Sequence, residues 1–467
     1  MSTTSTPSVP QQRSLADVVD IVSGFGFPKE LQSKPKGDLP FFKVGDISIA
    51  WNSGQKNLTQ AQHYLDQAEA SSIRAKAFPK GTVVFAKIGE AIRLNRRAIL
   101  GQPSIVDNNV MGLIPKEGVV DPTYLFYWSL MLRLGDISQA TTVPSVRKSD
   151  VEQLSFPWLP LDQQKRIVAE IEKQFSRLDE AVANLKRVKA NLKRYKAAVL
   201  KAAVEGRLVE TEAEIARREG RSYETGAQLL QRILETRRSQ WQGKGKYKEP
   251  AAPDTSDLPE LPAGWVWASV DQLTGDSLIG LDRGRDLQNS DGIGLPYVKM
   301  NNVTMEGEVT SEGMVYVDAS NEEKGRFNLQ TGDLLFNTRN SKELVGKVGI
   351  VRSPPSGAIY NNNLMRLRTV NSVMPGFVCS QMCSDGFRRR MELVKKATTN
   401  VAAVYAKDLF PLPLALPPLT EQHRIVAELD RRLSLLRETE AQVVANLTHT
   451  KRMRQAILKS TFSAGHD

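Results

Sequence analysis

Hydrophobic residues recur at a seven-residue spacing in two long, otherwise polar segments of the chain. In the first segment the spaced residues are Ile171, Leu178, Leu185, Leu192 and Val199, and a second row, partly one residue off register, contains Phe175, Val182, Val188 and Tyr195. In the second segment they are Leu429, Leu436, Val443, Thr450 and Ile457. A seven-residue spacing sustained over several repeats is typical of a coiled-coil seam. The pattern therefore predicts two long helices that pack against each other within one chain.

The two helical segments are copies of one sequence. Leu161-Asp-Gln-Gln-Lys-Arg-Ile-Val-Ala-Glu170 returns as Leu419-Thr-Glu-Gln-His-Arg-Ile-Val-Ala-Glu428, at an offset of 258 residues (419 − 161), and the matches continue without a gap. This period is far too long for a solenoid and indicates a duplicated half-protein. An antiparallel pair would place the domains that precede each helix at opposite ends. Alternatively, each helix packs only on its own domain, which would require neither the regular spacing nor the matched length.

The remaining sequence divides around these helices. The regions are a disordered N-terminus at 1–13, a first mixed domain at 14–160, the first spacer helix at 161–207, a helical extension and Pro-rich linker at 208–263, a second mixed domain at 264–418, and the second spacer helix with a C-terminal tail at 419–467. Short β-like runs between Gly, Pro and Asn turns are typical of α+β domains. We therefore expect an α+β fold in which two mixed domains are separated by an intramolecular antiparallel coiled coil, with pseudo-two-fold symmetry.

The two mixed domains also echo each other, more faintly. The paired segments are Leu39-Pro-Phe-Phe-Lys-Val with Leu295-Pro-Tyr-Val-Lys-Met, Gly81-Thr-Val-Val-Phe-Ala-Lys with Gly332-Asp-Leu-Leu-Phe-Asn-Thr, and Ile105-Val-Asp-Asn-Asn-Val-Met with Ile359-Tyr-Asn-Asn-Asn-Leu-Met. These paired segments, called anchors below, stay similar while the loops between them diverge. They suggest one scaffold that carries two different surfaces. Binding residues normally lie on such loops.

Composition and charge narrow the class of protein. The 467 residues are 40% hydrophobic and 25% charged, with a net charge of +11, and a basic surplus favours polyanionic partners. No apolar run approaches the roughly 20 residues of a membrane span, and the polar N-terminus is unlike a signal peptide. Cys379 and Cys383, the two cysteines, and the four histidines lack the spacing of a zinc site. We therefore expect a cytoplasmic protein with two half-buried thiols and no metal.

Motifs of catalysis are missing from the chain. It contains no Walker A phosphate loop, no Asn/Asp-Pro-Pro-Tyr/Phe element of amino-methyltransferases, and no clear nuclease arrangement of carboxylates on a β-hairpin pattern. The glycine-rich run Ser23-Gly-Phe-Gly-Phe-Pro28 is interpreted as a turn, because Pro28 stands where a nucleotide-binding helix would continue. The sequence predicts a chain without an active site of its own.

The order of these segments resembles the specificity subunit of a type I restriction-modification system. The resemblance rests on the two Leu-x-x-Gln-x-x-Ile-Val helix starts and on Leu258-Pro-Glu-Leu-Pro-Ala-Gly-Trp265, and it covers the chain from about residue 14 onward. It implies that each mixed domain is a target-recognition domain reading half of a bipartite, asymmetric site in double-stranded DNA. It also implies that the helices set the gap between the half-sites and dock two methyltransferase subunits, and that two restriction/translocase subunits join them. S-adenosylmethionine, ATP and Mg²⁺ would bind those partners, with no cofactor in this chain.

Basic and polar loops next to the repeated anchors are the candidate DNA contacts. Lys and Arg supply affinity through phosphates, while Arg and Asn are suited to guanine and adenine edges. In the first domain the candidates are Lys87, Arg93, Asn95, Arg96 and Arg97, and at the corresponding place in the second they are Arg339, Asn340, Ser341 and Lys342. Secondary candidates are Arg283, Arg285 and Lys299.

Three other functions remain as alternatives. One is the recognition chain of a related restriction system that cuts on both sides of its site. Another is a coiled-coil scaffold with no role on DNA, against which the basic charge and the Arg- and Asn-containing loops argue. The third is an enzyme such as a fused methylase-nuclease, which the missing motifs and the short chain disfavour.

Overall fold

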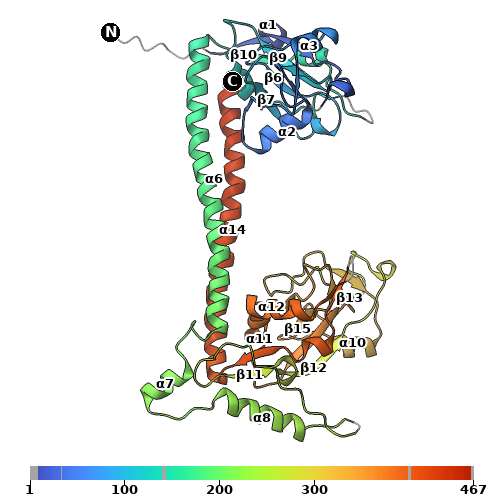
Figure 1. Ribbon diagram of the computed structural model, residues 1–467, viewed down its shortest axis with the longest axis vertical. Coiled ribbons are helices and arrows are strands. Elements are labelled where there is room, and N and C mark those ends of the chain that lie inside the picture. Colours follow the sequence, from blue (N-terminus) through green and yellow to red (C-terminus); the bar gives the residue numbers. More distant parts are fainter. Residues whose placement is uncertain (1–8, 33, 139–142, 244, 398–400, 464–467) are drawn as a thin grey trace. The chain divides into compact units, whose positions relative to one another are not determined.

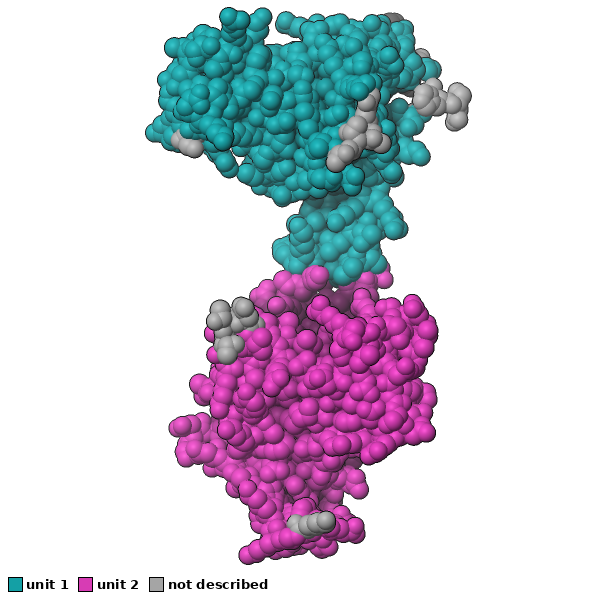
Figure 2. All heavy atoms as spheres, turned by 90° about the vertical axis from the view of Figure 1, so that its right-hand side faces the viewer, with its two compact units in different colours: residues 1–187, 443–467 teal, residues 188–442 magenta. Residues whose placement is uncertain are grey.

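The computed structural model describes residues 9–32, 34–138, 143–243, 245–397 and 401–463. It contains two compact units, one formed by Met1–Arg187 with Val443–Asp467 and the other by Val188–Gln442 (Figure 2). Two long helices, α6 (Leu161–Val204) and α14 (Leu419–Ser463), contribute to both units (Figure 1). In the described part of the chain, no helix is long and apolar enough to cross a membrane.

The first mixed domain lies in unit 1 and is built from short elements. Its strands are β1 (Gln11–Ser14), β2 (Val19–Ser23), β3 (Leu39–Phe42), β4 (Asn57–Leu58), β5 (His63–Leu65), β6 (Val83–Ala86), β7 (Arg97–Leu100), β8 (Ile105–Val106), β9 (Val110–Pro115) and β10 (Ser155–Trp158). Its helices and 3₁₀ turns are α1 (Leu15–Val18), η1 (Lys29–Leu31), α2 (Val44–Asn52), α3 (Gln67–Ser72), η2 (Glu90–Ile92), α4 (Pro122–Ser129) and α5 (Lys148–Glu152).

A five-stranded sheet in the order β2-β9-β6-β7-β4 forms the centre of this domain, beside a three-stranded sheet in the order β5-β3-β8. Every residue of β6 is buried. Val83 and Phe85 face one hydrophobic cluster, and Val84 faces another. Because successive side chains of a strand point to opposite faces, the apolar run Val-Val-Phe-Ala suits a central strand with a core on both sides.

The second mixed domain lies in unit 2. Its strands are β11 (Val266–Ser269), β12 (Thr274–Ile279), β13 (Leu295–Val298), β14 (Val315–Val317), β15 (Leu334–Asn337), β16 (Arg339–Asn340), β17 (Val348–Ile350), β18 (Ile359–Tyr360), β19 (Leu364–Thr369), β20 (Lys396–Ala397), β21 (Ala402–Ala403) and β22 (Pro413–Leu416). Its helices and 3₁₀ turn are α9 (Val270–Leu273), η3 (Arg285–Leu287), α10 (Asn321–Phe327), α11 (Pro375–Met382), α12 (Asp385–Val394) and α13 (Ala406–Leu409), and the preceding extension forms α7 (Glu212–Glu219) and α8 (Gly226–Ser239).

The two mixed domains share a scaffold. The sheet β12-β19-β15-β17 repeats the order β2-β9-β6-β7, and β14-β13-β18 repeats β5-β3-β8. The register agrees as well, because Val83 pairs with Ile99 in the first domain and Leu334 pairs with Ile350 in the second. The anchor segments matched in the sequence are therefore equivalent strands, as the duplication predicts.

Within each unit, an early part of one long helix packs on a late part of the other. In unit 1, Ile171 of α6 and Leu458 of α14 belong to the same hydrophobic cluster, and the Arg454 guanidinium lies 4.9 Å from the centre of the Phe175 ring. In unit 2, Val199 near the end of α6 clusters with Leu429 near the start of α14. The two helices therefore form an antiparallel pair, and the coiled coil predicted from the seven-residue spacing is confirmed.

The predicted seam is only partly correct. Leu436, Val443 and Thr450 are buried, and Leu178, Leu185 and Leu192 are half-buried. Val188 and Tyr195 of the second row are 41% and 48% exposed, because each lies one residue, about 100° around the helix, from the register set by Phe175 and Val182. In α14, Leu458 enters the core, while the predicted Ile457 beside it is half-buried.

Two predicted boundaries were wrong. Residues 11–13 are not disordered, because they belong to β1, which pairs antiparallel with β10, and Arg13 stacks 3.6 Å from the centre of the Trp158 ring. Residues 1–8 and the tail 464–467 lie outside the described residues. The first spacer helix ends at Val204 rather than at residue 207, since Gly206 has a φ of +67°. Glycine adopts this left-handed conformation without a side-chain clash.

The thiols of Cys379 and Cys383 are more deeply buried than the sequence suggested. Both belong to the main hydrophobic cluster of unit 2 and are free cysteines. Burial is common for cysteines that act as small apolar side chains. Cys379 on α11 and Cys383 at the end of that helix therefore help to pack α11 into the core of unit 2.

Candidate nucleic-acid interface

The candidate loops of the two domains occupy equivalent places. Residues 87–96 connect β6 to β7, and residues 338–347 connect β15 to β17. A positive φ occurs at the same position of each loop, +52° at Asn95 and +80° at Gly346. Asparagine and glycine are the residues that most readily adopt this conformation. The two loops thus share their flanking strands and this left-handed residue, while the backbone between these points differs, with the turn η2 in the first loop and strand β16 in the second.

In the β6–β7 loop, several predicted contacts have structural roles. The Lys87 ammonium donates to Ser23 Oγ at 2.9 Å, and Asn95 Oδ1 accepts from the Leu134 N–H at 2.9 Å. The exposed Arg93 side chain lies 3.5 Å from the Glu90 carboxylate. Arg96 is half-buried, and no hydrogen bond or ion pair holds its guanidinium among the described residues. Arg93 and Arg96 are therefore the side chains of this loop that a ligand can recruit at least cost.

Arg97 is a correction to the predicted set. Its side chain is fully buried, and it donates to Asn95 O at 2.7 Å and to Leu132 O at 2.5 Å. Burial lowers its pKa to about 9. Arg97 shares its face of β7 with Ile99, which lies in the core cluster. Arg97 therefore anchors the end of the loop from beneath and does not face a ligand.

The β15–β17 loop presents its polar side chains more openly. Arg339 and Lys342 are exposed, and Ser341 is half-buried. The Ser341 N–H donates to Asn340 Oδ1 at 2.8 Å, a local bond that orients the Asn340 amide. Arg339 lies on β16, which pairs with β21, so its backbone is held while its guanidinium remains free for a partner.

Of the three secondary candidates, Arg283 and Lys299 already have partners and Arg285 is exposed. Arg283 is tied to both carboxylate oxygens of Glu323, at 2.8 and 2.9 Å, and the Lys299 ammonium donates to Gln288 Oε1 at 2.9 Å. Arg285 is exposed at the start of η3. A ligand would have to break an existing pair to recruit Arg283, whereas Arg285 is available.

These loops therefore offer cations without a partner among the described residues, Arg96, Arg339 and Lys342, next to amides that are held by hydrogen bonds. Unpaired Arg and Lys side chains can neutralise phosphates, and Arg and Asn side chains can read base edges. Among the described residues, no group of three or more His, Cys, Asp or Glu side chains is placed to hold a metal ion. The chemistry of the loops is that of recognition of a polyanion.

Sequence reasoning missed the residues that join each domain to its helix. Gln164, in the first turn of α6, accepts from the Asp121 N–H at 2.8 Å and donates to Leu159 O at 2.6 Å. Gln422 in α14 makes the equivalent bonds, with the Met374 N–H at 2.9 Å and Pro417 O at 3.0 Å. Both glutamines are fully buried. Their identity in the repeated Leu-x-x-Gln motif was the signal that could have identified them.

A buried polar network fixes the start of α14. Glu421 accepts from Trp265 Nε1 and from the Glu212 N–H, each at 2.9 Å, and burial raises the pKa of its carboxyl. Burial alone would also raise the pKa of Glu212, but hydrogen bonds from Arg424 and Arg221 bring it below the ordinary value. The Trp265 of the Pro-rich motif and helix α7 are thereby attached to the second spacer helix.

Comparison with known proteins agrees with this organisation. Residues 8–194 match the family model of the type I restriction modification DNA specificity domain. The EcoKI specificity subunit of Escherichia coli K12 is 22% identical over 426 residues, covering 85% of this chain and 82% of that protein. The EcoDI specificity subunit of Escherichia coli is 22% identical over 350 residues, covering 74% of this chain and 70% of that protein.

Solved structures have the same fold. A chain from a structure of the type I R-M system, described for its complex assembly and conformational transition, is 20% identical with a TM-score of 0.60, and 98% of each chain is covered. The HsdS subunit from Thermoanaerobacter tengcongensis is 19% identical with a TM-score of 0.50, again over 98% of each chain. With its duplicated mixed domains and its antiparallel helix pair, the chain is similar over most of its length to specificity subunits of type I restriction-modification systems, and residues 8–194 match the DNA specificity domain of that family.

Proposed function

We propose that this chain reads a bipartite, asymmetric DNA site and assembles the methyltransferase and restriction/translocase subunits of a type I complex on it. The observation that carries the proposal is the pair of equivalent loops, which connect equivalent strands but carry different cations and amides. Two such readers would recognise two different half-sites. The two like helix starts, each clamped by a buried glutamine, suit the attachment of two like methyltransferases.

The division of labour follows from the same chemistry. The chain would supply no catalytic group, and two methyltransferase and two restriction/translocase subunits would carry out modification and cleavage. S-adenosylmethionine, ATP and Mg²⁺ would bind those partners. A methyltransferase must flip its target base out of the duplex, so the role of this chain would be to hold the DNA in place while that happens.

Base-resolved methylation mapping tests the proposal. DNA from cells that express this chain with its methyltransferase should carry methyl groups within one motif made of two unlike half-sites separated by a fixed gap. Cells that express the methyltransferase alone serve as the control. A short palindromic motif, or no methylation that depends on this chain, would contradict the proposal.

A further inference from the structure

A cleft in unit 1 lies between one side of the first turns of α6 and the first mixed domain. Its volume is about 830 Å³, and it is bounded by β4, by β7, by the start of α4 and by the exposed face of α6. The charged side chains around it are Lys56, Lys80, Asp121, Lys165 and Glu172. A volume of this size is within the range of pockets that hold ligands.

The two acidic groups of the cleft are already in use. Glu172 forms an ion pair with Lys56. Asp121 caps α4, accepting from the N–H groups of Thr123 and Tyr124 at 2.9 and 3.0 Å. Lys80 and Lys165 are exposed, and neither forms a hydrogen bond or ion pair in the described part of unit 1. The charge left for a ligand is therefore positive.

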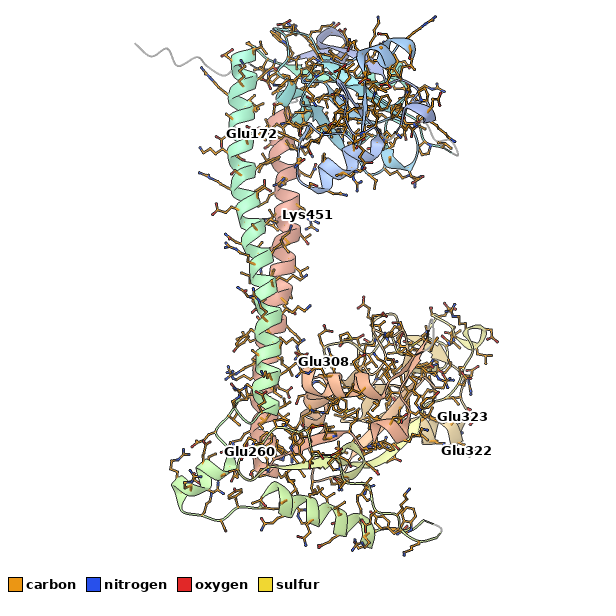
Figure 3. The ribbon with its side chains drawn as sticks, viewed as in Figure 1. Glu172, Glu260, Glu308, Glu322, Glu323 and Lys451 are labelled. Carbon is orange, nitrogen blue, oxygen red and sulfur yellow. The ribbon has the colours of Figure 1, made fainter. Side chains whose placement is uncertain are left out.

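At the equivalent place in unit 2 the chain forms an internal ion-pair network. The strand register makes Arg352 the counterpart of Gly101, and the helix offset makes Asp430 the counterpart of Glu172. Arg352 donates to Asp430 at 2.8 Å and lies 3.4 Å from Glu308. Figure 3 shows Glu172 on α6, and Glu308 on the side of the second mixed domain that faces the helix pair.

The difference between the two halves is built into their sequences. Gly101 leaves no room for a side chain, because a Cβ there would lie 2.9 Å from Leu58 O and 2.7 Å from a Thr59 carbon. The two free lysines have no counterpart either, since Thr331 and His423 stand at the positions of Lys80 and Lys165. The first half therefore keeps an open basic cleft where the second half has an internal ion-pair network.

We propose that this cleft binds an acidic peptide segment of the methyltransferase that assembles on the first half of the chain. A DNA duplex presents a convex surface that protruding loops read, and it cannot enter a cleft of this volume. An extended segment bearing Asp or Glu can enter it and pair with Lys80 and Lys165. Since an ion-pair network occupies the equivalent place in the second half and the two free lysines have no counterpart there, the two methyltransferases would be held unequally. This inference rests on the proposed assembly with methyltransferases.

Charge reversal tests the cleft in the full-length chain. The Lys80→Glu, Lys165→Glu variant should bind the methyltransferase at the first half at least tenfold more weakly, so that native mass spectrometry shows complexes with one methyltransferase accumulating at concentrations where the unmodified chain carries two. Lys36→Glu, Lys76→Glu is the matched control, because both side chains are exposed in the same domain and the net charge changes equally. Thermal melting should show that both variants remain folded.

Carbodiimide coupling, which joins amines directly to carboxylates, identifies the occupant. Peptides containing Lys80 or Lys165 should be cross-linked to Asp or Glu of the methyltransferase. The inference is overturned if these lysines give no such cross-link, or if the reversal leaves methyltransferase association unchanged. It is also overturned if the reversal weakens only DNA binding and lowers its salt dependence, which would mark the cleft as a nucleic-acid site. Failure of the proposed function is a separate result, in which the unmodified chain binds no methyltransferase.

Discussion

Two adjacent arginines show how little the residue type alone says about its role. Arg96 and Arg97 were both predicted to contact DNA, yet Arg97 points into the core of the first mixed domain and Arg96 does not. The pleat of β7 decides this, because neighbouring side chains leave a strand on opposite faces. The sequence shows the alternation, but its phase is set by the pairing of β7 with β6. That long-range information is absent from a local pattern.

We therefore expect Arg97→Ala to destabilise the domain. The substitution leaves the carbonyls of Asn95 and Leu132 without their buried donor, at a cost of about 2–4 kcal/mol in the free energy of unfolding. Chemical denaturation of the complex measures this cost. Arg96→Ala is the control and should leave the free energy of unfolding within about 0.5 kcal/mol of the unmodified protein. Equal destabilisation by both variants would refute the assigned roles.

The opposite outcome is expected for Arg339 and Lys342. Both side chains are exposed, so replacing them with alanine should leave stability unchanged while weakening DNA binding. Each lost phosphate contact lowers the slope of log K against log salt by about one. Binding titrations at several salt concentrations measure that slope, and methylation measures the consequence. If affinity, slope and methylation all stay the same, the β15–β17 loop is not a DNA contact.

At the scale of elements, the helix pair was the most predictable part of the fold. A seven-residue apolar repeat is a local signal, and it gave both the helices and their pairing. Its errors lie at Val188 and Tyr195, where the second row drifted by one residue. The role of the repeated glutamines could not be read locally, because their partners lie in the mixed domains and become neighbours only in the fold.

Gln164→Ala tests the attachment of the first mixed domain to α6. The substitution leaves the Asp121 N–H and the Leu159 carbonyl buried without a partner, so we expect a loss of about 2–4 kcal/mol in the free energy of unfolding. Gln174→Ala is the matched control on the same helix, since the only side-chain bond of that residue among the described residues is with Glu170. If Gln164→Ala lowers the free energy of unfolding no more than the control does, the hydrogen bonds of Gln164 do not stabilise the domain.

Removing one heptad from each long helix tests the spacer role. Residues 182–188 and 441–447 are opposite segments if the pairing of Ile171 with Leu458 continues along the helices. Their joint deletion keeps the seam in register and shortens the pair by about 10 Å, or about three base pairs. Methylation mapping should then show unchanged half-sites with a shorter gap. Altered half-sites at the original gap would rule out the spacer role.

At the scale of the whole molecule, duplication was evident from the sequence, whereas the divergence of the two halves was not. The matched anchors predicted a shared scaffold, and the strand order and register confirm it. The open cleft of one half and the closed network of the other depend on single substitutions, such as Arg352 in place of Gly101. The sequence alone does not show such differences, because strand pairing defines which positions of the two halves are equivalent.

Exchange of the second mixed domain tests whether the two mixed domains recognise their half-sites independently. Replacing residues 274–404 with the equivalent segment of another specificity subunit retains β11, β22 and the Trp265–Glu421 contact that fixes α14. The core clusters of unit 1 contain no residue of this segment. Methylation mapping should therefore show one new half-site, with the other half-site and the gap unchanged. A change in both half-sites would mean that the two mixed domains influence each other's recognition although their hydrophobic cores are separate.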